Sequence, residues 1–201
     1  GSAMKYIVIL MLITSVWMMV KETEETVERQ HEEEITVSWL RDRQDGTKNS
    51  VLEKGSFFVA QRNTVYGADC KGCTIENDMS STSSRIMVSV NAVRQSDGSW
   101  KQGVTYDGYY LIAADKALPM CTVVRISRHT YSGSGIVVNE PFYALVVDRG
   151  SMIQENTIDL FAGSEKYPQI VHESLGGAIV EIVDYLNYQE NEFGQMTCAG
   201  K

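Results

Sequence analysis

The chain has 201 residues, 43% of them hydrophobic and 22% charged, which excludes a wholly disordered protein and allows a sizeable core. Its 18 lysines and arginines against 26 aspartates and glutamates give a formal net charge of −8. A basic surface that binds nucleic acid is therefore not expected. The length predicts one domain with appendages.

The first 34 residues divide into three segments. Residues 1–3 have the character of a cloning remnant and are set aside. Residues 4–20 contain an apolar run after Lys5, the layout of a secretory signal or signal-anchor, with a buried core helix or strand as the alternative. Residues 21–34, with seven glutamates and two cations, predict a solvated acidic stalk. We therefore expect an exported protein, secreted or, if 4–20 is retained, membrane-anchored.

Residues 35–201 are predicted to form one domain that is mainly β and carries a C-terminal extension. Short β-branched and aromatic runs alternate with Gly, Asn, Asp and Ser breaks, which favours a small closed barrel. A helix is expected at 164–175, and 177–188 is compatible with a strand or a helix. The predicted strands are 35–40, 56–60, 85–93, 109–113, 122–127, 135–139, 142–147 and 157–161.

Four cysteines bear on the cellular compartment. Cys70 and Cys73 form a C-x-x-C in a glycine-containing loop, and in an exported chain a local disulfide is the leading interpretation. No second C-x-x-C is present and the three histidines lack ligand spacing, so no metal site is predicted. Cys121 and Cys198 are also free to pair, but the sequence does not decide this.

Three aspartates carry the strongest chemical signal. Asp115 and Asp148 end apolar runs, and Asp159 lies inside a third. A carboxylate in an apolar strand is costly to bury, so it must be compensated or functional. If the strands meet in one barrel, desolvation and mutual repulsion raise at least one pKa, and such a carboxyl can act as a general acid. The alternative is that each aspartate caps a turn or accepts backbone hydrogen bonds.

The segments around these aspartates resemble a known family. Residues 108–122 resemble the pattern G-x-x-A-x-D-x-x-x-I-P-L-G-T, and 146–164 resemble V-x-D-x-G-G-x-I-x-G-N-x-I-D-(LVI)-(FY)-x-G-S. These are patterns of the three-aspartate (3D) domain family, which is related to membrane-bound lytic transglycosylase A and YuiC-like wall-lytic proteins. Residues 66–73 resemble a Y-G-x-D-C-x-G-C element of related barrels. Ser151, Glu155 and the pair Met120-Cys121 depart from the patterns, which have Gly, Gly and Leu-Gly there.

The resemblance implies a small six-stranded double-psi β-barrel with short helices and a hairpin inserted within 125–142. It also implies a peptidoglycan lytic transglycosylase that cleaves the bond between N-acetylmuramic acid and N-acetylglucosamine and leaves a 1,6-anhydro-muramoyl end. Asp159 matches the general acid/base, with Asp148 and Asp115 in support. The implied partner is the glycan strand at the cell wall, and no cofactor is implied. The candidate substrate-binding residues are Tyr66, Trp100, Tyr109, Tyr110, Arg149 and Asn156.

Other functions are compatible with the same residues. The main alternative is a non-catalytic double-psi module that binds cell-wall glycan, including a phage-derived one, and the departures at Ser151 and Glu155 favour it. A structural protein that presents the barrel on its stalk and an ordinary glycoside hydrolase are further alternatives. The sequence makes no prediction of oligomeric state.

Overall fold

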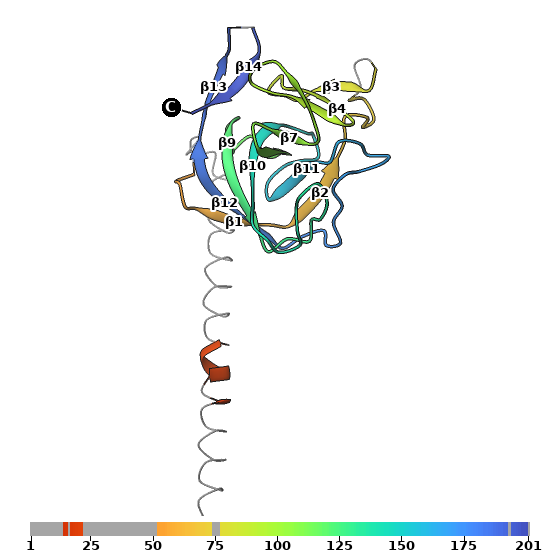
Figure 1. Ribbon diagram of the computed structural model, residues 1–201. Helices are drawn as coiled ribbons and strands as arrows, with labels where there is room; N and C mark the ends of the chain where they lie inside the picture. The colour runs from red at the N-terminus through yellow and green to blue at the C-terminus, as the bar shows by residue number, and fades with distance from the viewer. Residues whose placement is uncertain (1–13, 16, 22–51, 74–76, 193, 201) are drawn as a thin grey trace, which may run out of the picture.

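A computed structural model describes residues 14–15, 17–21, 52–73, 77–192 and 194–200 (Figure 1). The cloning remnant, most of the apolar segment, nearly all of the acidic stalk and the strand expected at 35–40 lie outside these residues. Residues 14–15 and 17–21 are helical, and Trp17, Met18 and Met19 are exposed there. In the part of the chain that the structure describes, no helix has the length and apolar character needed to cross a membrane.

The described part of the domain is built from short β-strands. In chain order they are β1 (Phe57–Ala60), β2 (Arg62–Tyr66), β3 (Met79–Ser81), β4 (Met87–Ser89), β5 (Ala92–Arg94), β6 (Trp100–Gln102), β7 (Thr105–Tyr106), β8 (Tyr109–Ala113), β9 (Thr122–Ser127), β10 (Phe142–Asp148), β11 (Thr157–Phe161), β12 (Ala178–Tyr185), β13 (Asn187–Glu190) and β14 (Met196–Ala199).

The main sheet curls into a nearly closed barrel. Its strand order is β1-β12-β9-β10-β8-β11-β2, with β7 added to β8. The two ends of this path, β1 and β2, are consecutive in the chain and joined only by Gln61, so the sheet returns to its own beginning (Figure 1). The Gln61 backbone N–H donates to the carbonyl of Asn156 at 2.9 Å, which ties the junction to the approach to β11. The expectation of a mainly β, barrel-like fold is confirmed.

Alternation of buried side chains explains why these segments form strands. In β12, Ala178, Val180 and Ile182 are buried, while the residues between them are partly exposed. The central strand β8 is instead buried at three successive positions, Leu111–Ala113, because both of its faces are covered. The largest fully buried side chains include Phe58, Leu111, Ile112, Ile126, Tyr131, Leu145, Ile158, Leu160 and Phe161.

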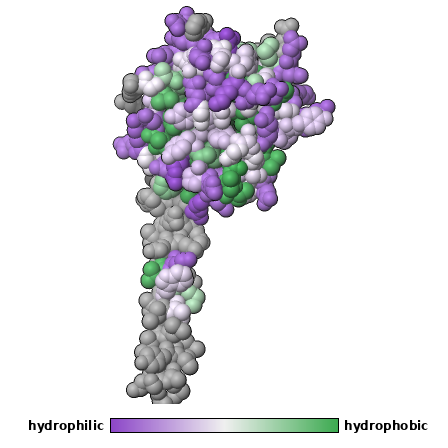
Figure 2. Space-filling model, in the orientation of Figure 1, coloured by the Kyte–Doolittle hydropathy of each residue, from purple (hydrophilic) through white to green (hydrophobic). Residues whose placement is uncertain are grey.

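Two smaller sheets and two disulfides complete the domain. Strands β3-β4-β5-β6 form a four-stranded sheet, and β13-β14 form a two-stranded one. The disulfide Cys121–Cys198 fastens β14 to the residue before β9. The disulfide Cys70–Cys73 closes the loop after β2, which confirms the pairing expected for that C-x-x-C. The face seen in Figure 2 is mostly hydrophilic, with small separate apolar patches.

Several predicted elements need correction. The helix expected at 164–175 is wrong: this segment is an irregular loop, in which the Gln169 N–H donates to Ala162 and Val171 forms a β-bridge with Ser132. Those external partners, with Pro168 in the middle, replace the hydrogen bonds of a helix. The strand expected at 135–139 is a turn, because Ser134, Gly135 and Asn139 have positive φ.

The remaining differences concern strand bounds and number. The strand expected at 85–93 is two strands, β4 and β5, paired as a hairpin. The ambiguous segment 177–188 forms the strand β12 and the start of β13. The main sheet contains eight strands, and the prediction that six strands form the barrel stays a prediction.

Candidate active site

The sheet brings two of the three aspartates together. Strand β8 lies between β10 and β11, and its last residue, Ala113, pairs with Asp148 on one side and Asp159 on the other. Neighbouring strands lie about 4.8 Å apart, so the two aspartate backbones are about 10 Å apart across one strand. Burial is the main cause of the raised pKa of Asp159, and the charge of Asp148 makes a small further contribution.

Asp159 is largely buried against β2. Its Oδ1 accepts a hydrogen bond of 2.7 Å from the hydroxyl of Thr64, the residue paired with it across β2 and β11. Burial raises the pKa of Asp159 to about 6, the negative charges of Glu165 and Asp148 add to the rise, and the Thr64 hydrogen bond and Arg62 oppose it. A carboxyl of this kind is partly protonated near neutral pH, as a general acid requires.

Asp148 is held in one orientation by backbone and side-chain donors. Its Oδ1 accepts hydrogen bonds of 2.8 Å each from the N–H of Ser83, the hydroxyl of Ser83 and the N–H of Arg149. Ser83 lies in the turn between β3 and β4, so the small sheet supports the end of β10. This arrangement fixes where Asp148 presents its charge to Asp159.

Asp115 has a different environment. It is buried, its Oδ1 accepts from the N–H of Ala117 and its Oδ2 accepts from the N–H of Glu155, both at 2.8 Å. These contacts join the loop after β8 to the loop before β11. The structure thus places Asp115 as a residue that accepts backbone hydrogen bonds, the alternative considered for each aspartate above.

Arg149 joins the same loops from β10. Its guanidinium donates to the backbone carbonyls of Ala114, Asp148 and Leu118 at 2.6–3.2 Å. Burial lowers the pKa of Arg149, while the charges of Asp115 and Asp148 oppose that shift. The side chain that was expected to bind substrate therefore holds the backbone on which Asp115 and Asp148 lie.

The loop after β2 packs closely on the loop after β11. A Cβ added to Gly67 would lie 2.2 Å from the backbone nitrogen of Glu165, so only glycine fits there. Asp69 accepts from the hydroxyl of Ser164 and from the N–H of Glu165, both at 2.6 Å. This contact fixes Glu165, whose charge acts on Asp159.

The other predicted substrate-binding residues are dispersed. Asn156 is 2% exposed, and Tyr110 donates its hydroxyl to the carbonyl of Ser134 at 2.7 Å. Tyr109 is half-buried and packs against the core, and Trp100 lies on β6 in the four-stranded sheet. Among these aromatic residues, only Tyr66 senses the charges of both Asp148 and Asp159. Burial is the main cause of the raised pKa of Tyr66, and the two negative charges add to it.

Several residues around Asp148 and Asp159 were not predicted from the sequence. Thr64 and Arg62 belong to β2, a strand that was not predicted, and Ser83 and Glu165 approach from loops. Tyr167 lies two residues beyond Glu165 and is 74% exposed, the highest value among the exposed aromatic rings of the described part. The one available signal was the position of Thr64 two residues before Tyr66, which places both on one face of a strand.

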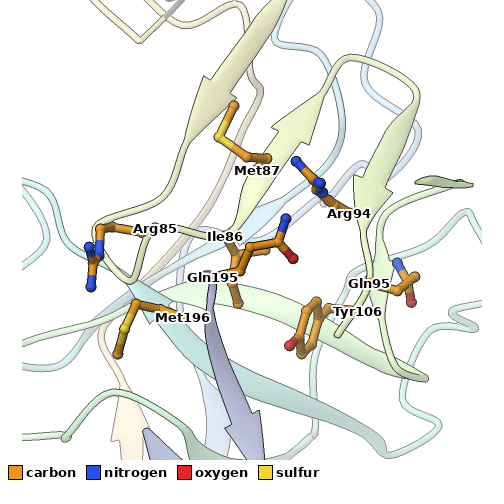
Figure 3. A pocket seen from close by; sticks show the side chains of 8 residues that line it. All are labelled: Arg85, Ile86, Met87, Arg94, Gln95, Tyr106, Gln195 and Met196. Carbon is orange, nitrogen blue, oxygen red and sulfur yellow. The ribbon is translucent and has the colours of Figure 1, made fainter. Parts of the chain in front are cut away.

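A separate hollow lies at the small sheets (Figure 3). Its lining includes Arg94, Tyr106, Gln195 and the two methionines Met87 and Met196. With its amide oxygen turned toward Arg94, Gln195 accepts hydrogen bonds of 2.7 Å from that guanidinium, so the two side chains satisfy each other. None of the three aspartates lines this hollow.

Two departures from the family patterns lie at strained backbone positions. Cys121 and Glu155 occupy positions where the patterns have glycine, and both have positive φ, 68° and 56°. Non-glycine residues in the left-handed region are disfavoured by about 1–2 kcal/mol. The Cys121 side chain forms the disulfide with Cys198, which glycine could not form. The hydrogen bond from Glu155 to Asp115 instead uses the backbone N–H, which glycine would also supply.

Replacing Glu155 with glycine is therefore expected to stabilise the protein by about 1 kcal/mol, because the strain is relieved and the backbone hydrogen bond to Asp115 is kept. Urea unfolding of both proteins measures the change. Ser151→Gly is the matched control, since Ser151 has an ordinary φ and glycine there only adds freedom to the unfolded chain. Equal shifts in the two variants would contradict the interpretation.

The raised pKa of Asp159 also predicts how the free energy of unfolding depends on pH. A carboxyl whose folded pKa is raised to about 6 favours the folded state fully at pH values below about 3.8, and this contribution is lost as the pH rises through about 6. Asp159→Asn cannot ionise, so the variant should match the wild type near pH 3 and be more stable by about 3 kcal/mol at pH 7. Thermal unfolding at several pH values measures this difference, and a constant difference between the two proteins would contradict it.

Comparisons with family profiles, with curated proteins and with solved structures find no match for this chain.

Proposed function

We propose that the protein is a peptidoglycan lytic transglycosylase with Asp159 as its general acid and base. The observation that carries the proposal is the Asp159 carboxyl, whose pKa burial raises to about 6 beside a second carboxylate, Asp148. Acid-catalysed cleavage of a glycosidic bond needs a proton donor of this kind. The sequence patterns around both aspartates support the choice of reaction.

The proposed reaction needs no external water. Asp159 donates its proton to the oxygen that links N-acetylmuramic acid to N-acetylglucosamine, and the bond between that oxygen and muramoyl C1 breaks. The muramoyl C6 hydroxyl then attacks C1, and its proton passes to the Asp159 carboxylate. The carboxyl is restored and the muramoyl end carries a 1,6-anhydro ring. One acid/base group serves both steps, while an ordinary glycosidase divides the work between two carboxylates.

Asp148, Thr64 and Asp115 have supporting roles in this proposal. The charge of Asp148 favours the protonated form of Asp159, and its three donors keep that charge in place. Thr64 occupies Oδ1 of Asp159, which leaves Oδ2 to carry the proton to the substrate. Asp115 holds the two loops beside the site through backbone contacts.

The double-psi form of the barrel is part of the same proposal. It is supported by two parallel strand pairs, β8 with β10 and β2 with β11, within a sheet whose other pairs are antiparallel. Six of the eight strands would make the barrel. We also place the protein at the cell wall outside the cytoplasm, because disulfides persist in oxidising compartments.

A glycan-binding module that does not cleave is the second candidate. Tyr167 favours it, because a sugar could stack on this exposed ring, which lies two residues along the chain from Glu165, whose charge acts on Asp159. Lys166 lies over the Tyr167 ring with its Nζ 5.2 Å from the centroid. Such an aromatic platform serves binding whether or not cleavage follows.

Digestion of purified glycan strands by the full chain tests both candidates. Mass spectrometry should find new anhydro-muramoyl ends, which lack one water relative to reducing ends. Reducing ends would indicate a hydrolase, and strand binding without new ends would indicate the binding module. Either of these results would overturn the proposal.

A further inference from the structure

The hydroxyl of Tyr66 is unusual among the polar groups of the barrel. It is buried, and within the described residues it makes no hydrogen bond of normal geometry, although Asp148 is close enough for a poorly aligned hydrogen bond to add to the raised pKa of Tyr66 that burial mainly causes. A buried hydroxyl without a partner is unfavourable by about 1–3 kcal/mol, so its retention beside two carboxylates calls for a reason. The family resemblance suggested only that its ring binds sugar.

The position of Tyr66 is rigidly determined. It is the last residue of β2 and pairs with Phe161 of β11, two residues beyond the pair of Thr64 with Asp159. Residues two apart on a strand share a face, so Tyr66 follows Thr64 on the side of the sheet where Thr64 contacts Asp159. The Tyr66 ring packs edge-on against Phe161, with centroids 5.5 Å apart.

The next residue restrains the strand further. Gly67 lies against the backbone of Ser164 and Glu165, so the end of β2 cannot shift toward β11. The negative charges of Asp148 and Asp159 both act on the Tyr66 hydroxyl, Asp148 more strongly. The hydroxyl is therefore close enough to both carboxylates to sense their charge, and it can redirect its hydrogen by rotation about its C–O bond.

We propose that Tyr66 is a positioning residue whose hydroxyl bridges Asp148 and Asp159, turning its hydrogen toward the Asp159 carboxylate as that group gives up its proton. No proton leaves the phenol, and only the direction of its hydrogen bond changes. The inference rests on the proposed function and assigns Tyr66 a task in that reaction.

The hydrogen bond from Tyr66 should stabilise the ionised form of Asp159 more than the protonated form. While Asp159 is protonated, the carboxyl gains little from a further donor. Once it becomes a carboxylate, a hydrogen bond from a buried phenol stabilises it. An interaction that strengthens only as the reaction proceeds accelerates the chemical step without tightening substrate binding.

The expected pH effect follows from the groups around Asp159. Besides Tyr66, they are Thr64 and Arg62 of β2, Asp148 of β10, Glu165 of the loop after β11 and Tyr131 of the segment between β9 and β10. Tyr66→Phe leaves these groups in place and removes one donor to the Asp159 carboxylate. The protonated form of Asp159 should then persist to higher pH.

Kinetics of the full-length Tyr66→Phe variant on purified glycan strands test the proposal. We expect kcat to fall about tenfold or more with KM unchanged, and the alkaline limb of the pH profile to move to higher pH. Tyr185→Phe is the matched control, since this hydroxyl donates to the backbone carbonyl of Leu52, and its kcat should equal that of the wild type. An unchanged kcat, or a raised KM alone, would overturn the proposal.

A titration separates this inference from the proposed function. Carbon NMR of the Asp159 carboxyl in wild type and in Tyr66→Phe needs no catalysis, and the midpoint should be higher in the variant. If the variant shifts the midpoint but the wild type releases no anhydro ends, the bridging role stands and the proposed function fails. If the wild type cleaves and the variant leaves both rate and midpoint unchanged, the inference about Tyr66 is wrong.

Discussion

Replacing Asp159 with asparagine is expected to abolish cleavage of glycan strands, with a loss of at least about 100-fold in kcat. The amide has nearly the shape of the carboxyl and can still accept the hydrogen bond from Thr64, but it has no acidic proton to donate. The release of anhydro-muramoyl ends per enzyme molecule measures the effect.

A matched substitution distinguishes the loss of the acid from a loss of folding. Asp97 lies in the turn between β5 and β6 and accepts hydrogen bonds from Ser99, so Asp97→Asn removes a carboxylate outside the site. It should cleave at the wild-type rate. Circular dichroism should find all three proteins folded. Wild-type turnover by the Asp159→Asn variant would exclude Asp159 as the acid.

Removal of the disulfide Cys121–Cys198 is expected to have the largest effect on stability. Its cysteines are 77 residues apart, and a cross-link over a loop of that size disfavours the unfolded chain by about 4 kcal/mol in the chain-entropy account. The bond also fastens the strand β14 to the entrance of β9. The double variant Cys121→Ser, Cys198→Ser should lose about 3–4 kcal/mol in urea unfolding.

The second disulfide is the natural control for the first. Cys70 and Cys73 are only 3 residues apart, so their bond closes a short loop and the same account assigns it about 1–2 kcal/mol. The variant Cys70→Ser, Cys73→Ser should therefore be clearly more stable than the other double variant. Equal losses from the two pairs would show that loop size does not determine their contribution.

The central strands could be predicted because their local residue pattern is compatible with few structures other than a strand. The bounds predicted for β8, β9 and β11 agree with the structure, since each is a run of apolar and β-branched residues between turn residues. Strand β2 was missed because its sequence, Arg-Asn-Thr-Val-Tyr, starts with a charged residue and an amide. Its pairing with β11, far along the chain, makes it a strand.

The site was predictable only in part for the same reason. Asp148 and Asp159 stood out as carboxylates in apolar runs, and the structure brings them to one residue of β8. Their partners Thr64 and Ser83 lie 95 and 65 residues away in sequence, so local patterns carry no trace of these contacts. Asp115 has the same local pattern as Asp148, yet accepts backbone hydrogen bonds with both oxygens.

The central claim is that Asp159 remains partly protonated near neutral pH. Carbon NMR titration of its side-chain carboxyl in the wild-type protein tests this most directly, with Asp159→Asn identifying the signal. We expect a midpoint near pH 6, because burial raises the pKa of Asp159 to about 6. A midpoint near 4, the value of an exposed aspartate, would contradict the claim and remove the proton donor that the reaction needs.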